Sequence, residues 1–166
     1  MTITVEDGTL VAGANSYVSV ADAWDYAQAR GISLPTDDAE IEAIILKAMD
    51  YLEAFDGRFK GDRVERDQAL SWPRDGVEIE GWEWSSDEIP RQVLNAQLAL
   101  IIEINAGEDP HNPSGATLPV IRKRVEGAVE VEYANPGVPM KVSKTQPSRT
   151  IINTLLRSSG LFAIRA

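Results

Sequence analysis

Apolar residues recur at helical spacing in four segments of the chain. The strongest repeat follows Asp37 and Glu40, which form a capping signature at the start of a helix. Its apolar stripe runs in three- and four-residue steps through Ile41, Ile44, Ile45, Ala48, Leu52 and Phe55. A shorter repeat covers about 20–30, after a second capping pair formed by Ser19 and Asp22. The pattern therefore predicts two amphipathic helices in the amino-terminal part of the chain.

The other two helical segments differ in how much of their circumference is apolar. Residues 93–104 are apolar nearly all round, which is typical of a helix in the centre of a bundle or between subunits. Residues 86–88, followed by Pro90 in the first turn, indicate where this helix begins. The last helix is predicted to begin at Ser148 and to carry an apolar face made of Ile151, Ile152, Leu155 and Leu156.

Two stretches lack the helical period. Between residues 57 and 86, glycines and Pro73 interrupt the sequence, and we expect a long ordered loop with a short helical turn near 66–70. Farther on, apolar and acidic residues alternate, which predicts one β-hairpin over 120–133 with an acidic second strand. In that strand the apolar residues Val129, Val131 and Tyr133 share one face. The first strand is basic and carries Arg122, Lys123 and Arg124.

These elements predict a mainly α protein, a small helical bundle of about four helices with one β-hairpin and long ordered loops. The length of 166 residues favours a single domain. Within 1–166 we expect a helical core over about 18–106, the hairpin over 120–133, and a carboxyl-terminal docking helix and tail over 148–166.

Charge divides the chain into two parts. The formal net charge is −10, from 16 basic and 26 acidic residues. Residues 1–60 hold four basic and eleven acidic side chains, and residues 61–120 hold four and twelve. Residues 121–166 reverse the balance, with eight basic and three acidic side chains. An acidic body with a basic end suggests two different partners, or a basic end that neutralises the acidic body of a neighbouring subunit.

The composition favours no catalytic, metal or membrane function. Without cysteine there is no disulfide framework, thiolate zinc site or cysteine nucleophile, and His111 is the single histidine available to a catalytic triad. The acidic residues at 37–42 have the spacing of a capped helix start without a calcium-loop pattern, and those at 78–83 lack histidine or cysteine companions. We therefore expect no metal, no cofactor and no enzymatic activity. The densest apolar run, residues 98–102, is too short to span a bilayer, and the amino terminus has no signal-like run.

Nucleic-acid binding has little support in the residue pattern. The acidic balance argues against a protein that coats duplex DNA, and no aromatic residue interleaves the basic triplet at 122–124. The tryptophans stand among carboxylates, which favours core or interface positions. Residues 57–61 resemble a phosphate-binding loop only superficially, because the Gly-Lys-Ser/Thr ending is missing. We therefore expect any contact with DNA to be weak and nonspecific.

Several stretches resemble one family. They are residues 13–23, 57–61, 67–77, 89–90 and 129–133. The most specific part is the run containing Gln68, Trp72, Pro73 and Arg74. Together these stretches resemble the tailed-phage proteins catalogued as DnaT-like and single-stranded-DNA-binding, which look like head-to-tail connector adaptors.

The resemblance implies a structural subunit of the virion neck, made in the host cytoplasm. Such subunits form a ring, commonly of twelve copies, beneath the portal. The ring extends the DNA channel used in DNA ejection and offers a platform to the next neck or tail-completion protein. The alternative function is a single-stranded-DNA-binding or DNA-packaging accessory protein.

On this interpretation the residues take three roles. The expected portal-docking interface is Arg149, Ile151, Ile152, Leu155, Leu156, Leu161 and Phe162. The hairpin residues Arg122, Lys123, Arg124, Val129, Val131 and Tyr133 are expected between subunits, while Gln68, Trp72, Pro73 and Arg74 are expected to be structural. Acidic walls would let duplex DNA pass without tight binding. Removal of 148–166 is expected to abolish portal binding and to leave the helical fold intact.

Overall fold

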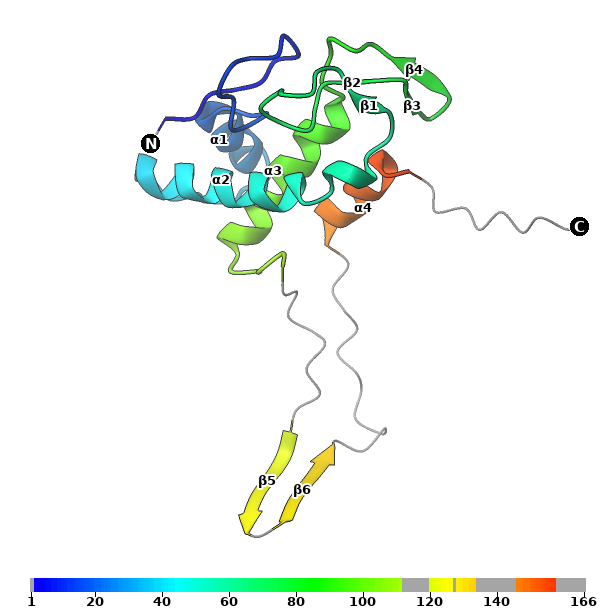
Figure 1. Cartoon of the computed structure of the whole chain (residues 1–166). Helices are drawn as coiled ribbons and strands as arrows, with labels where there is room; N and C mark the ends of the chain where they lie inside the picture. Colours follow the sequence, from blue (N-terminus) through cyan, green and yellow to red (C-terminus); the bar gives the residue numbers. More distant parts are fainter. Residues whose placement is uncertain (1, 112–119, 127, 134–145, 158–166) are drawn as a thin grey trace, which may run out of the picture.

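In the part of the chain that the structure describes, four α-helices form the body of the molecule (Figure 1). The computed structural model describes residues 2–111, 120–126, 128–133 and 146–157. The helices are α1 (Val20–Gln28), α2 (Asp38–Glu53), α3 (Arg91–Asn105) and α4 (Pro147–Leu155). Helix α3 packs against each of the other three, so the helix that is apolar nearly all round lies at the centre of the bundle. No helix in these described ranges is long and apolar enough to cross a membrane.

The caps of α1 and α2 follow the predicted signatures. Ser19 accepts a hydrogen bond from the backbone N–H of Asp22, and the Asp22 carboxylate accepts one from the Ser19 N–H. Asp37 accepts from the N–H groups of Ala39 and Glu40. Helix α3 differs from the prediction, because it begins only after Pro90, with Arg91 as its first residue.

The expectation of a mainly α protein is wrong. The described residues contain, besides the four helices, three two-stranded antiparallel sheets, so the protein is mixed α and β. Two of the sheets lie in the predicted loop and pair β1 (Asp62–Arg63) with β2 (Arg74–Asp75) and β3 (Val77–Ile79) with β4 (Trp82–Trp84). Strands of two or three residues are too short for alternation to reveal them. The helical turn in this region is η1 (Asp56–Arg58), whereas the turn predicted near 66–70 is present at 66–67 but is not helical.

The third sheet is the predicted hairpin. Strands β5 (Val120–Glu126) and β6 (Ala128–Tyr133) are antiparallel, and their register sets Arg122 opposite Glu132 and Arg124 opposite Glu130. The basic strand and the acidic strand therefore pair with each other. The hairpin holds three basic and three acidic residues and is neutral as a whole.

Helix α4 is part of the hydrophobic core. Ile152 and Leu155 are completely buried, and α4 packs on α3. Each such side chain contributes about 1.5–3 kcal/mol when it is buried. Removal of 148–166 would uncover α3, so the packing argues against the expectation that the fold survives this deletion.

The start of α4 also differs from the prediction. Ser148 is not the cap residue but lies in the first turn, after Pro147. Its backbone N–H and its hydroxyl both donate to the Glu103 carboxylate of α3, at 2.9 and 2.6 Å. A side chain from another helix thus satisfies the amino-terminal end of α4.

Candidate nucleic-acid interface

The most specific family motif is structural. Gln68 accepts a hydrogen bond from the Glu65 N–H and donates from its amide nitrogen to the carbonyls of Leu70 and Pro73, at 2.7 and 3.0 Å. Trp72, which precedes a cis peptide bond to Pro73, is 1% exposed and donates its backbone N–H to the Tyr17 hydroxyl. These contacts fix the loop that follows α2.

A buried polar cluster joins this loop to α2. The Glu53 carboxylate accepts hydrogen bonds from the Ser71 N–H, the Ser71 hydroxyl and the Tyr17 hydroxyl. Burial, together with the nearby Glu53 carboxylate, raises the pKa of Tyr17 well above its ordinary value. The tyrosine hydroxyl therefore stays protonated and serves as a link in the core.

A second polar cluster is centred on Arg74, and we name it the Asp56 network. It consists of Asp56, Arg63, Arg74 and the backbone carbonyls of Lys60, Gly61 and Ser71. The guanidinium of Arg74, whose side chain is 5% exposed, donates to all three carbonyls and to Asp56. Arg63 donates to the same Asp56 oxygen at 3.2 Å. Although burial favours its neutral form, hydrogen bonds from Arg63 and Arg74 hold the pKa of Asp56 below its ordinary value.

Beside this network lies a groove of about 540 Å³, between η1, the turn of the β3–β4 hairpin and the end of α4. We name it the cationic groove. It is lined by Arg58, Lys60, Ile79, Glu80, Asn153, Thr154, Leu156 and Arg157. Three of these side chains are cationic and one is anionic, which makes the groove locally positive.

Backbone contacts hold the two walls of the groove together. Lys60 donates its N–H to the Leu155 carbonyl at 3.0 Å, and Arg157 donates its N–H to the Arg58 carbonyl at 2.8 Å. Phe59 and Leu156 form a β-bridge between these contacts. These contacts join residues 58–60 to residues 155–157, about a hundred positions later in the chain, where the end of α4 lies beside η1 (Figure 1).

The three cations of the groove differ in how far they are engaged. Arg157 donates to the carbonyls of Phe59 and Gly61 and forms an ion pair with Asp62 at 2.7 Å, but its side chain remains 54% exposed. Arg58 is exposed, with its guanidinium 5.4 Å from the ring centre of Phe55. The half-buried Lys60 side chain has no hydrogen bond or ion pair within the described part of the chain.

The groove contrasts with the rest of the body. Residues 2–111 hold eight basic and 23 acidic side chains. Several of the other basic side chains are engaged locally: Arg30 lies over the Tyr26 ring at 3.3 Å, and Arg149 donates to the Tyr51 hydroxyl at 2.9 Å. Lys47, Arg66 and Arg91 are exposed elsewhere on the body, but the groove is the place where three cationic side chains line one hollow.

An exposed aromatic side chain stands next to the groove. Trp82 is 76% exposed, and the register of β3 and β4 sets it directly opposite Ile79, which lines the groove. Residues opposite each other in an antiparallel pair have their side chains on the same face. Trp82 therefore lies on the groove side of the β3–β4 hairpin.

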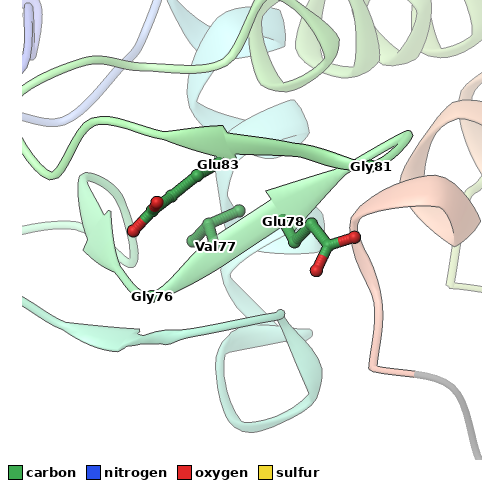
Figure 2. Close-up of a pocket in the computed structure, with 5 residues that line it drawn as sticks. All are labelled: Gly76, Val77, Glu78, Gly81 and Glu83. Carbon is green, nitrogen blue, oxygen red and sulfur yellow. The ribbon is translucent and has the colours of Figure 1, made fainter.

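A smaller pocket of about 320 Å³ in the same hairpin is acidic. It is lined by Gly76, Val77, Glu78, Gly81 and Glu83 (Figure 2). The carboxylates of Glu78 and Glu83, which are opposite each other in the register, point away from one another on either side of Val77. No group of three or more histidine, aspartate or glutamate residues in the described ranges is placed to hold a metal ion.

The predicted portal-docking residues do not form an open surface. Ile152, Leu155 and Leu156 are buried within the chain, Ile151 is half-buried, and Arg149 is bonded to Tyr51. Leu161 and Phe162 lie outside the described residues. The apolar face of α4 is not available to a partner, because α3 already covers it.

For the hairpin residues the structure gives only the register. Arg122, Lys123 and Arg124 pair with Glu132, Val131 and Glu130, and Val129 pairs with Val125. Tyr133 pairs with Val120.

Sequence reasoning did not predict the groove, and of its lining residues it named Leu156 alone as a site residue, for portal docking. The stretch at 57–61 contributes Arg58 and Lys60, although it lacks the ending of a phosphate-binding loop. Its basic residues between two glycines were the available signal. The contribution of Arg157 and the exposure of Trp82 depend on tertiary packing, which no local pattern reveals.

Comparison with known proteins gives one match. The family model described as "Putative DnaT-like ssDNA binding protein" matches residues 1–166. No curated protein matches the chain significantly, and neither does any solved structure. Because the match covers the whole chain, this protein belongs to the DnaT-like family.

Proposed function

We propose that this protein binds single-stranded DNA without sequence preference, through the cationic groove. The observation that carries the proposal is the convergence of three cationic side chains in one groove of an otherwise acidic body. The description of the family, which names single-stranded DNA, supports the same function. From the sequence, DNA binding was the alternative to a connector role; here it comes first, because the net charge of the chain does not describe the charge of a single groove.

The groove offers the contacts that a phosphodiester backbone needs. Arg58 and Lys60 carry charges that the described part of the chain leaves open, and Arg157 keeps half of its side chain exposed. Asn153 and Thr154 supply polar groups on the opposite wall. Up to three phosphate contacts predict that the logarithm of the affinity falls with the logarithm of salt concentration with a slope of about −2. The acidic surroundings keep the binding weak.

The test is the affinity of the full chain for a fluorescent oligothymidylate, measured by anisotropy at low salt. The double variant Arg58→Ala with Lys60→Ala removes two charges and keeps the backbone bonds that these residues make to α4 and Arg74. The matched control is Arg66→Ala with Arg91→Ala, which removes two exposed charges outside the groove. We expect at least a tenfold loss of affinity in the first variant and a much smaller change in the control. Equal losses would show that only net charge matters.

A head-to-tail connector subunit is the second candidate function. The observation that favours it is the acidic surface outside the groove, which repels duplex DNA and suits a channel wall. In this proposal copies of the chain form a ring, of twelve subunits by the family resemblance, between a portal and the next neck protein. Docking would use surfaces other than the apolar face of α4, which is buried. Both candidates are non-enzymatic.

The two candidates predict different results with portal particles. Mixing the purified chain with portal rings and imaging the product by electron microscopy should reveal an added ring if the connector proposal is correct. Portal binding by a chain that does not bind oligothymidylate would favour the connector over the groove. Binding of oligothymidylate without any portal complex would favour the first proposal.

A further inference from the structure

We propose that Trp82 stacks on an unpaired base and so makes the protein selective for single-stranded over duplex DNA. This inference rests on the proposed binding of single-stranded DNA by the cationic groove. It assigns a role to a side chain whose exposure the fold does not explain.

The exposure of Trp82 sets it apart from the other tryptophans. Trp72 is buried in the core, and Trp24 and Trp84 are half-buried against it, whereas Trp82 is 76% exposed. Among the described residues the other exposed large hydrophobic side chain is Val64, at 38%. An indole that packs against so little of its own chain leaves most of its surface open to a ligand.

The β3–β4 hairpin holds this indole at a fixed place. Glu80 and Gly81 form the turn with positive φ angles of 55° and 82°, the combination that a two-residue turn between twisted strands requires. The register then sets Trp82 opposite Ile79, about 5 Å away between Cβ atoms, and the Ile79 side chain lines the groove. Val77 and Ile79 are buried and anchor the hairpin on the body. The backbone position of Trp82 is therefore fixed beside the groove before a base binds.

Stacking beside a cationic groove distinguishes single strands from duplexes. Every base has a π-face, so an aromatic ring next to a backbone-binding groove binds single strands with little sequence preference. In a duplex those faces are covered by neighbouring bases, whereas the phosphates remain accessible. The groove alone therefore binds both forms, and Trp82 adds affinity for the unpaired form alone.

Glu80 provides an independent test of the geometry. Its side chain lines the groove, where a carboxylate repels a phosphate. Glu78 lies one position before Ile79 and so faces the opposite side of the hairpin, in the pocket of Figure 2. We expect Glu80→Gln to strengthen binding of oligothymidylate severalfold and Glu78→Gln to change it much less, although both variants remove one negative charge.

The decisive experiment compares Trp82→Ala and Trp82→Phe with wild type on a single-stranded oligothymidylate and on a duplex of the same length. We expect Trp82→Ala to lower affinity for the single strand by about tenfold or more, with little change for the duplex. Trp82→Phe, which retains a ring, should recover most of the loss. Val64→Ala is the control for removal of an exposed apolar side chain. Quenching of tryptophan fluorescence by oligothymidylate should be strongly reduced in Trp82→Phe.

The outcomes separate this inference from the proposed function. If Arg58→Ala with Lys60→Ala weakens binding while Trp82→Ala does not, stacking is wrong and the groove still binds DNA. If Trp82→Ala weakens single-strand and duplex binding equally, the selectivity is wrong. If wild type binds no oligothymidylate, both proposals are wrong. Loss of portal assembly in Trp82→Ala with unchanged DNA affinity would overturn stacking and identify Trp82 as a protein contact.

Discussion

The Asp56 network and the cationic groove lie side by side, and both contain basic residues, but these residues differ in how many hydrogen-bond partners they have. In the network, Arg74 has a hydrogen-bond acceptor for each of its guanidinium nitrogens and is almost inaccessible to solvent. In the groove, Lys60 has no such partner in the described part of the chain, and Arg58 is exposed. Basic residues that are fully engaged hold the loops in place, and those left open are available to a ligand. If the groove binds DNA as proposed, structural and ligand-binding cations are distinguished by their partners rather than by their position in the sequence.

The largest expected effect belongs to the centre of the network. Arg74→Ala removes the guanidinium donor to the Lys60 and Ser71 carbonyls and leaves Asp56 with Arg63 and the Gly61 carbonyl with Arg157. We therefore expect a loss of about 3–5 kcal/mol in the free energy of unfolding. Urea denaturation followed by circular dichroism measures it. Arg66→Ala, at a side chain that is 96% exposed, should change stability by less than about 0.5 kcal/mol. A loss below about 1 kcal/mol in Arg74→Ala would show that the network is not structural.

Gly61 joins the two regions and gives the second prediction. Its carbonyl accepts from Arg74 of the network and from Arg157 of the groove, and its φ is +66°. A Cβ there would lie 2.2 Å from the Asp75 carbonyl oxygen, so we expect Gly61→Ala to cost about 2–4 kcal/mol. Gly57→Ala is the control, since no atom lies within 4 Å of its Cβ. Denaturant midpoints of the two variants should differ clearly, and equal midpoints would contradict this geometry.

The sequence predicts the larger elements of this fold and not the site. Periodicity is strong in α2 and alternation is strong in β6, because each spans enough residues to repeat. Trp72 and Trp82 both stand among charged residues in the sequence, yet one is in the core and the other is exposed. Their difference arises from strands of two or three residues and from the docking of α4. These are tertiary contacts between distant segments, and no local pattern encodes them.

Acid should weaken the Asp56 network. The pKa of Asp56 is held below its ordinary value in the folded chain, so its contribution is present above the unfolded pKa of about 4 and is lost as pH falls through the lower folded pKa. We expect the stability difference between wild type and Asp56→Asn, about 1 kcal/mol at pH 7, to shrink below about pH 4. Urea midpoints of both proteins at pH 7 and about pH 3 measure this. A difference that grows as pH falls would reverse the sign and contradict the network.

The smallest expected effect on stability belongs to the groove, and it sharpens the comparison most. Arg58→Ala with Lys60→Ala removes side chains that lack the engagements of Arg74 and leaves their backbone hydrogen bonds in place. We therefore expect its free energy of unfolding to stay within about 0.5 kcal/mol of wild type, even though its affinity for oligothymidylate falls. Because Arg58 and Lys60 lie in an acidic body, the loss of their positive charges lowers the free energy of unfolding only slightly. A large loss of stability would place these two side chains with Arg74, as part of the scaffold. Stability that is retained while binding is lost would separate the two regions, since the same change would then leave the fold intact and remove a ligand contact.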